Sequence, residues 1–134
     1  MSAIEKNHKV YVGIGSNINQ GIHIRACIKA LNNEFTNLEL SPTYESSSMG
    51  FDGPNFYNLV AVFMTKYDVI KLKNILNAIE IENGRSLGEV KFSSRTLDID
   101  IVLQIDEDEE ILFESDEIEK YFFIFIDLKH YIDI

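Results

Sequence analysis

The spacing of apolar residues constrains the fold of this chain most, because it switches repeatedly between the period of a strand and that of a helix. KVYVGIGSN, residues 9–17, is rich in β-branched and aromatic residues and predicts a strand that ends in a turn at Gly15, Ser16 and Asn17. The next segment, 22–35, predicts a helix capped by Asn17 or Asn19, with apolar residues at helical spacing: Ile24, Ile28, Leu31 and Phe35.

Two further strands are predicted after this helix. NLELSPTYESS, residues 37–47, predicts a second strand, and a glycine-containing loop leads to a third, FYNLVAVFMT, residues 56–65. Alternation in the third strand assigns one face to Tyr57, Leu59, Ala61 and Phe63. The opposite face receives Phe56, Asn58, Val60, Val62 and Met64.

A second helix and a fourth strand complete the pattern. Asp68 is the expected N-cap of this helix, Asn83 and Gly84 end it, and its apolar stripe comprises Val69, Leu72, Leu76 and Ile79. TLDIDIVLQI, residues 96–105, then predicts a strand. The order strand, helix, strand, strand, helix, strand predicts an α+β fold, the ferredoxin-like βαββαβ arrangement, with both helices on one face of an antiparallel sheet. With 134 residues and no linker-like tract, we expect one domain over 1–134.

Charge and composition exclude several classes of function. The net charge is −10, and residues 106–119, DEDEEILFESDEIE, hold nine acids and no base. Such a run is typical of a solvated loop, and its field repels polyanions, so we expect no nucleic-acid partner. No apolar stretch has the length of a signal peptide or a membrane span, and the lone Cys27 is expected to be a small buried residue. We therefore expect a cytoplasmic protein without membrane attachment. We also expect it to act as a monomer.

Two aspartates interrupt the last strand. Asp98 and Asp100 project from the same face, about 6 to 7 Å apart at their α-carbons, whereas Ile99, Ile101 and Leu103 are expected to face the helices. Hard oxygen ligands on one rigid face suit Mg²⁺, which retains waters and accepts phosphate oxygens. Aspartates on a solvated strand surface would have the same spacing, so the pair alone leaves both interpretations open.

Two arginines favour a phosphate-binding role. Arg85 ends the second helix and Arg95 precedes the acidic strand, so they flank the polar loop 86–94. Guanidinium groups bind phosphate through paired hydrogen bonds, and carboxylates with arginines form a plausible phosphoryl-transfer set. The chain contains neither a Walker A sequence nor a kinase glycine-rich loop, so any use of ATP belongs to another family.

The segments YVGIGSN, NFYNLVAVFMT and RTLDIDIVL, in this order and at these distances, resemble the 6-hydroxymethyl-7,8-dihydropterin pyrophosphokinases of folate biosynthesis. The resemblance covers roughly Val10 to Leu103, and the element RTLDID is highly specific. It implies a ferredoxin-like fold and transfer of pyrophosphate from ATP, as co-substrate, to the pterin hydroxymethyl group, with AMP as the second product.

The resemblance also implies roles for individual residues. Asp98 and Asp100 would hold two Mg²⁺ ions that bridge the ATP phosphates, and Asp98 would also contact the pterin. Arg85 and Arg95 would bind phosphates, with Phe92 as the aromatic residue of the catalytic loop and Glu80 near the adenine. The residues implied around the pterin are Ser47, Gly50, Phe56, Asn58 and Phe122. Ordinary core or loop roles stay open for Ser47, Phe56 and Phe122, and a turn role stays open for Gly50.

The match to the family pattern ends after Leu103. The family has a proline-histidine element and a downstream arginine that serve the ATP phosphates, whereas ILFESDEIEKYFF here contains no proline, histidine or arginine. Three hypotheses follow: an active pyrophosphokinase with a variant ATP site, an impaired homologue that binds a pterin or a protein partner, and a Mg²⁺-dependent nucleotide-binding domain with another acceptor. The first is favoured, because the aspartates and both loop arginines are retained at the family's spacing.

Overall fold

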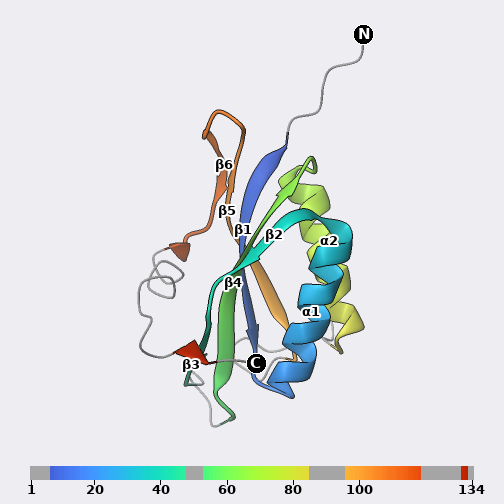
Figure 1. The fold of residues 1–134 in the computed structure, drawn as a ribbon, viewed down its shortest axis with the longest axis vertical. Helices are drawn as coiled ribbons and strands as arrows, with labels where there is room; N and C mark the ends of the chain where they lie inside the picture. The colour runs from blue at the N-terminus through green and yellow to red at the C-terminus, as the bar shows by residue number, and fades with distance from the viewer. Residues whose placement is uncertain (1–6, 48–52, 85–95, 119–130, 133–134) are drawn as a thin grey trace.

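The computed structural model describes residues 7–47, 53–84, 96–118 and 131–132, and in this part of the chain it contains two helices and seven strands (Figure 1). The elements, in chain order, are β1 (His8–Ser16), α1 (Gln20–Glu34), β2 (Thr36–Leu40), β3 (Thr43–Ser46), β4 (Phe56–Thr65), α2 (Val69–Glu82), β5 (Asp98–Ile105), β6 (Ile111–Glu114) and β7 (Tyr131–Ile132).

The strands form one sheet in the order β6-β5-β1-β4-β3-β7, with β2 also pairing with β4, and every pairing is antiparallel. Both helices lie on the same side of this sheet (Figure 1). The predicted α+β, ferredoxin-like arrangement is therefore confirmed. No helix among the described residues is long and apolar enough to cross a membrane.

The core lies between the helices and the inner face of the sheet. Phe35, just after α1, stacks on Phe63 of β4 with ring centroids 4.0 Å apart, and Cys27 is fully buried as expected. The predicted inner face of β4 is confirmed, since Tyr57, Leu59, Ala61 and Phe63 all pack in this cluster. The buried members of the helix stripes are Ile24, Leu31, Leu72, Leu76 and Ile79.

The predicted second strand is divided in two. Leu40 pairs with Ala61 and Tyr44 pairs with Asn58, so three residues of the β2–β3 edge lie opposite two residues of β4. Pro42 lies in this bulge and has no N–H to donate. The Ser41 hydroxyl accepts the Val60 N–H at 2.8 Å, while Ser41 N–H donates to the Val60 carbonyl at 2.8 Å. Two strands therefore replace the single one expected, and both follow the same edge of β4.

A second bulge corrects the position expected for Leu103. On β1, Val12 pairs with Ile101 and Tyr11 pairs with Leu103, so Val102 has no counterpart in this ladder. An extra residue shifts the side-chain alternation by one position. Ile99 and Ile101 pack against the helices as predicted, whereas Val102 and Leu103 belong to a small cluster with Val60 on the opposite face. The prediction that Leu103 faces the helices was wrong, because it assumed unbroken alternation.

The helix ends follow the sequence only in part. Asp68 caps α2 as predicted, since its carboxylate accepts the Lys71 N–H at 2.9 Å, and Gly84 follows the helix with φ +88°. Asn19 is the N-cap of α1, but it has φ 48° and its side chain makes no capping hydrogen bond. Asn17 is fully buried instead, and its amide donates to the Pro54 carbonyl at 3.1 Å, which joins the end of β1 to the loop before β4.

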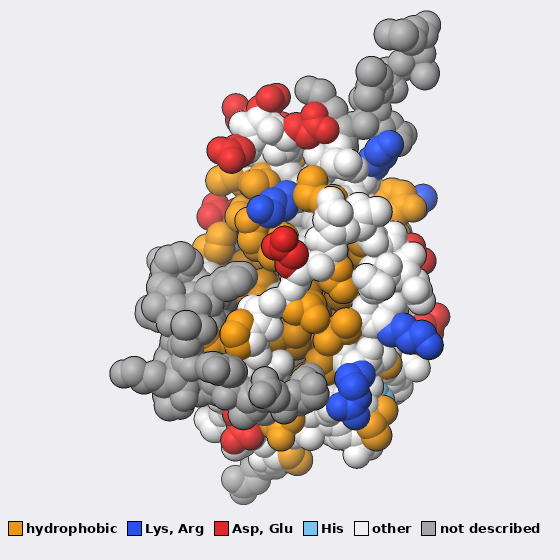
Figure 2. Space-filling model, in the orientation of Figure 1, with side chains coloured by type: hydrophobic (Ala, Val, Ile, Leu, Met, Phe, Trp, Pro, Cys, Tyr) orange, Lys and Arg blue, Asp and Glu red, His pale blue; other side chains and the backbone are white. Residues whose placement is uncertain are grey.

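The most acidic part of the chain forms the turn between β5 and β6. The Asp106 carboxylate accepts the N–H groups of Asp108 and Glu110, each at 2.9 Å, and Glu109 adopts φ 63°. This turn lies at the end of β5 opposite to Asp98 (Figure 1), and in Figure 2 its acidic side chains gather at the upper end of the molecule. Seven residue steps of β5 correspond to roughly 23 Å. The turn is therefore remote from the Asp98 end of the strand.

Burial of Cys27 predicts a pH effect on stability. Desolvation, and secondarily the negative charge of Glu80, raises the pKa of this thiol from 9.0 to about 12. Between these values the unfolded chain has released a proton that the native state retains, so the free energy of unfolding falls as pH rises through this window. Urea denaturation should therefore show the wild type losing stability relative to Cys27→Ala above pH 9.0, with a constant difference below it. Parallel stability curves across the window would contradict the prediction.

Candidate active site

The face of the sheet opposite the helices carries the candidate site. The central strand β1 pairs with β5 on one side and β4 on the other, and Gly15 lies opposite both Asp98 and Asn58. One step along the same face, Gly13 lies opposite both Asp100 and Val60. Directly paired residues share a face, so the two aspartates and Asn58 project on the same side from the strands that flank β1. Between them, the two glycines of β1 have only a hydrogen atom as side chain. We call Gly13 and Gly15 the glycine floor.

The glycine floor was not foreseen from the sequence, where Gly15 was interpreted only as a turn residue. A signal for it was present, because G-x-G inside a β-branched run places both glycines on one face of a strand. A Cβ at Gly15 would lie 3.2 Å from Asn58 Oδ1 and 3.7 Å from the Phe56 ring. The separation from Asn58 Oδ1 is shorter than an ordinary van der Waals contact. Asn58 can therefore occupy this position only because residue 15 is a glycine and has no Cβ.

Asp98 and Asp100 lie on this face as predicted. Ile99 and Ile101, the residues that alternate with them, are each 6% exposed within the core, which anchors the strand beneath the carboxylates. Both aspartates are only partly buried. Two partly exposed hard oxygen donors on one rigid strand fit Mg²⁺, which needs few protein ligands because it retains waters and takes phosphate oxygens. Within residues 7–47, 53–84, 96–118 and 131–132, no three acidic, histidine or cysteine side chains cluster as a complete metal cage.

Glu80 is buried between α2 and β5. Only 4% of it is exposed, and its Oε2 accepts the backbone N–H of Ile99 at 2.8 Å. Ile99 separates the two aspartates, so this bond joins α2 to the strand segment that carries them. A buried carboxylate needs such donors to offset its desolvation. The role of Glu80 near an adenine stays a prediction. In the structure, its hydrogen bond with Ile99 ties α2 to β5, the strand that carries Asp98 and Asp100.

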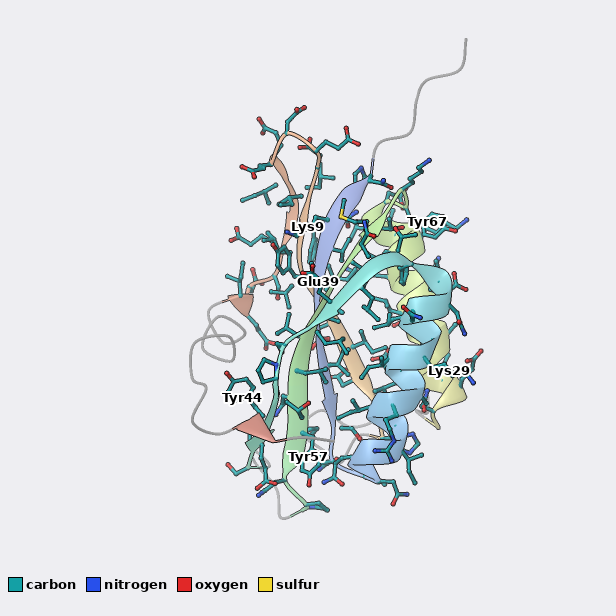
Figure 3. All side chains as sticks on the ribbon, viewed as in Figure 1. Lys9, Lys29, Glu39, Tyr44, Tyr57 and Tyr67 are labelled. Atoms are coloured by element: carbon teal, nitrogen blue, oxygen red, sulfur yellow. The ribbon has the colours of Figure 1, made fainter. Side chains whose placement is uncertain are left out.

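Phe56 and Asn58 project from β4 on the same face as the aspartates. Asn58 Nδ2 donates to Ser46 Oγ at 2.8 Å and lies 3.5 Å from the Phe56 carbonyl oxygen. Tyr44, two residues before Ser46, shares this face because it pairs with Asn58, whereas Tyr57 packs on the helix side (Figure 3). Ser47, the serine implied by the resemblance, is exposed just after β3. The sequence did not predict the contact between Ser46 and Asn58. It depends on the register of β3 with β4, which the bulge at Pro42 shifts.

The structure thus brings Asp98, Asp100, Asn58 and Phe56 to one face, with Glu80 behind the strand. Five of the residues implied by the resemblance lie outside the described part of the chain: Gly50, Arg85, Phe92, Arg95 and Phe122. Their roles stay predictions. The order of the elements does place the two ends of segment 85–95 at Gly84, after α2, and at Thr96, before β5.

Comparison with known proteins identifies one family and several relatives that this chain resembles. The sequence model of the 7,8-dihydro-6-hydroxymethylpterin-pyrophosphokinase (HPPK) family matches residues 11–130. A 2-amino-4-hydroxy-6-hydroxymethyldihydropteridine pyrophosphokinase of Pseudomonas aeruginosa is 37% identical over 99 residues, which cover 71% of this chain and 60% of the relative.

Two further relatives carry the same name. The protein of Haemophilus influenzae is 36% identical over 98 residues, covering 69% of this chain and 60% of the relative. The protein of Pseudomonas putida is 35% identical over 102 residues, covering 74% of this chain and 84% of the relative. This chain therefore spans 60% of the length of the first two relatives.

The contact between Glu80 and β5 predicts a measurable loss of stability. Glu80→Ala leaves the buried Ile99 N–H without this acceptor, which costs about 1 to 3 kcal/mol of unfolding free energy. Glu80→Gln retains an oxygen acceptor and should lose less. Urea denaturation measures both, and Glu82→Ala, an exposed carboxylate two residues along α2, is the matched control. Equal stabilities for Glu80→Ala and Glu82→Ala would show that the hydrogen bond does not hold the strand.

Proposed function

The chain belongs to the 7,8-dihydro-6-hydroxymethylpterin-pyrophosphokinase family, and on that premise we propose that it transfers pyrophosphate from ATP to 6-hydroxymethyl-7,8-dihydropterin. The observation that carries the proposal is the shared face of Asp98, Asp100 and Asn58 around the glycine floor. In this arrangement, the two carboxylates could hold a metal ion that binds a phosphate chain, and the Asn58 amide beside them could bind a polar heterocycle. Residues 1–134 would act as one domain, as a monomer in the cytoplasm.

Asp98 and Asp100 are the residues that would hold Mg²⁺, two ions in the family's pattern. When bound, the ions would neutralise phosphate charge and align the triphosphate. Through the Mg²⁺ that they would hold, the carboxylates would fix the position of the phosphate chain on the sheet, because both project from one strand anchored by Ile99 and Ile101. Asp98, at the start of β5, would also be the carboxylate nearest the pterin.

The reaction requires an alcohol as nucleophile. The hydroxymethyl oxygen of the pterin would form a bond to the β-phosphorus of ATP, and the bond from that phosphorus to the oxygen bridging to the α-phosphate would break. The hydroxyl proton would pass to solvent water, and AMP would leave. Catalysis of this kind depends on positioning and charge neutralisation, to which Arg85 and Arg95 would contribute by binding phosphate oxygens. Phe92 and Glu80 would complete the nucleotide side of the site.

The pterin would occupy the face over Gly15. Asn58 would bind an edge of its ring, and Phe56 would stack on one side of it with Phe122 on the other. Ser47 and Gly50 would line the same region. The 3.7 Å separation between the Phe56 ring and a Cβ built at Gly15 supports this proposal, because it places an aromatic ring beside the open floor.

The position of the acidic turn favours an active enzyme. The five acids Asp106–Glu110 lie roughly 23 Å from the Asp98 end of β5, more than twice the screening length at physiological salt. Their repulsion of a triphosphate bound at the aspartates is therefore strongly screened.

The lack of proline, histidine and arginine in residues 111–123 favours the second candidate, an impaired homologue that binds a pterin or a protein partner.

The proposal predicts production of AMP that depends on both aspartates. Purified protein with ATP, MgCl₂ and 6-hydroxymethyl-7,8-dihydropterin should form AMP and the pterin diphosphate, measured by chromatography. Asp98→Asn and Asp100→Asn should each lower kcat by at least about 10²-fold to 10³-fold, because each removes a carboxylate that would hold the Mg²⁺ needed to neutralise the phosphate charge. Chelation of Mg²⁺ by EDTA should abolish the reaction.

The control is Asp108→Asn, which removes the same charge from the acidic turn at the far end of β5. Its rate should equal that of the wild type. Pterin binding by calorimetry without AMP formation would support the impaired homologue instead. AMP formation that survives in the double variant Asp98→Asn, Asp100→Asn would overturn the assignment of the aspartates.

A further inference from the structure

The contacts of its side-chain amide give Asn58 a defined orientation. β4 lies between β1 and β3, and the two ends of the amide point to these two neighbours. Nδ2 donates to Ser46 Oγ of β3 at 2.8 Å, whereas Oδ1 lies over Gly15 of β1, 3.2 Å from where a Cβ would be. The amide oxygen is thus directed over the glycine floor, toward the strand that carries Asp98.

Two neighbours maintain this orientation. The Phe56 carbonyl oxygen lies 3.5 Å from Nδ2 and can only accept, so a reversed amide would place two oxygens against each other. The Ser46 hydroxyl holds the amide plane through the shorter bond, and it tolerates either end of the amide because it both donates and accepts. Ser46 therefore limits rotation, and the Phe56 carbonyl selects which end faces β1.

Gly15 provides the space for the oxygen. An alanine there would bring its Cβ to 3.2 Å from Oδ1, closer than an ordinary van der Waals contact. The obstacle would be this contact alone, since Gly15 is not among the residues of positive φ. Loss of the Ser46 hydroxyl should therefore change where the amide oxygen points. A Cβ at position 15 should have the same effect, because it would crowd the oxygen.

We infer that Ser46 and Gly15 are positioning residues that present Asn58 Oδ1 as a hydrogen-bond acceptor, so that the site selects a planar heterocycle with an N–H donor on its bound edge. The inference rests on the proposed function and extends it to specificity. In a 2-amino-4-oxopteridine, N3 carries a hydrogen, whereas in a 2,4-diaminopteridine N3 is itself an acceptor. A fixed amide oxygen attracts the first edge and repels the second.

The test compares two ligands and four variants. Calorimetry should show that the wild type binds 6-hydroxymethylpterin more tightly than 2,4-diamino-6-hydroxymethylpteridine. Ser46→Ala should reduce the ratio of the two affinities about tenfold, the value of one hydrogen bond, because the amide can then rotate. Ser46→Thr retains the hydroxyl and should restore the ratio. Gly15→Ala should weaken pterin binding, whereas Gly21→Ala, where the nearest atoms belong to the flexible Arg25 guanidinium, should not.

A ligand-free measurement separates this inference from the proposed function. In ¹⁵N-labelled protein, the Asn58 side-chain NH₂ resonances, assigned through their loss in Asn58→Ala, should move in Ser46→Ala and return in Ser46→Thr. Unchanged resonances with an unchanged affinity ratio would overturn the inference. If the wild type bound neither pteridine, the proposed function and the recognition role would both fail, while the resonances would still show whether Ser46 holds the amide.

Discussion

The pairing of β1 with both of its neighbours is the constraint on which the rest of the structure depends. Because β1 occupies the centre of the sheet, its register with β5 and with β4 determines which residues meet across it. Gly15 lies between Asp98 and Asn58, residues 40 positions apart in the chain. A shift of one residue in either ladder would turn the aspartates or Asn58 toward the helices, where carboxylates would be desolvated.

The bulge in β5 changes which side chains this strand presents on each face of the sheet. On the inner face, Ile99 and Ile101 complete the core under α1 and α2, and Glu80 accepts the Ile99 N–H from the helix side. Beyond the aspartates, the extra residue Val102 reverses the alternation, so Val102 and Leu103 cover the outer face with Val60. The strand is therefore polar outward at its Asp98 end and apolar outward in its middle, which confines the open polar region to one end of the sheet.

The charge of the chain is also separated along β5. The aspartates proposed to hold Mg²⁺ stand at one end, and the turn Asp106–Glu110 stands at the other, where its own backbone N–H groups satisfy the Asp106 carboxylate. Of the nine acids in residues 106–119, the fold places the five of this turn at the far end of β5, whereas Glu114 on β6 lies opposite Leu103. Two buried ionisable groups, Cys27 and Glu80, lie on the helix side of the sheet, where Cys27 belongs to the core and Glu80 accepts the Ile99 N–H.

The sequence by itself determined the order of the elements, the inner face of β4, the cap at Asp68 and the common face of Asp98 and Asp100, because each of these follows from local periodicity or a single side-chain hydrogen bond. It also contained the family's specific motif. Only the tertiary structure decided that Leu103 turns outward, that Ser46 accepts a hydrogen bond from Asn58, and that two glycines form the floor between the aspartates and the amide. The first two features depend on strand register and bulges, which are properties of pairing between distant segments. The G-x-G pattern places both glycines on one face of β1, but only its pairing with β4 and β5 puts Asn58 and the aspartates on either side of them.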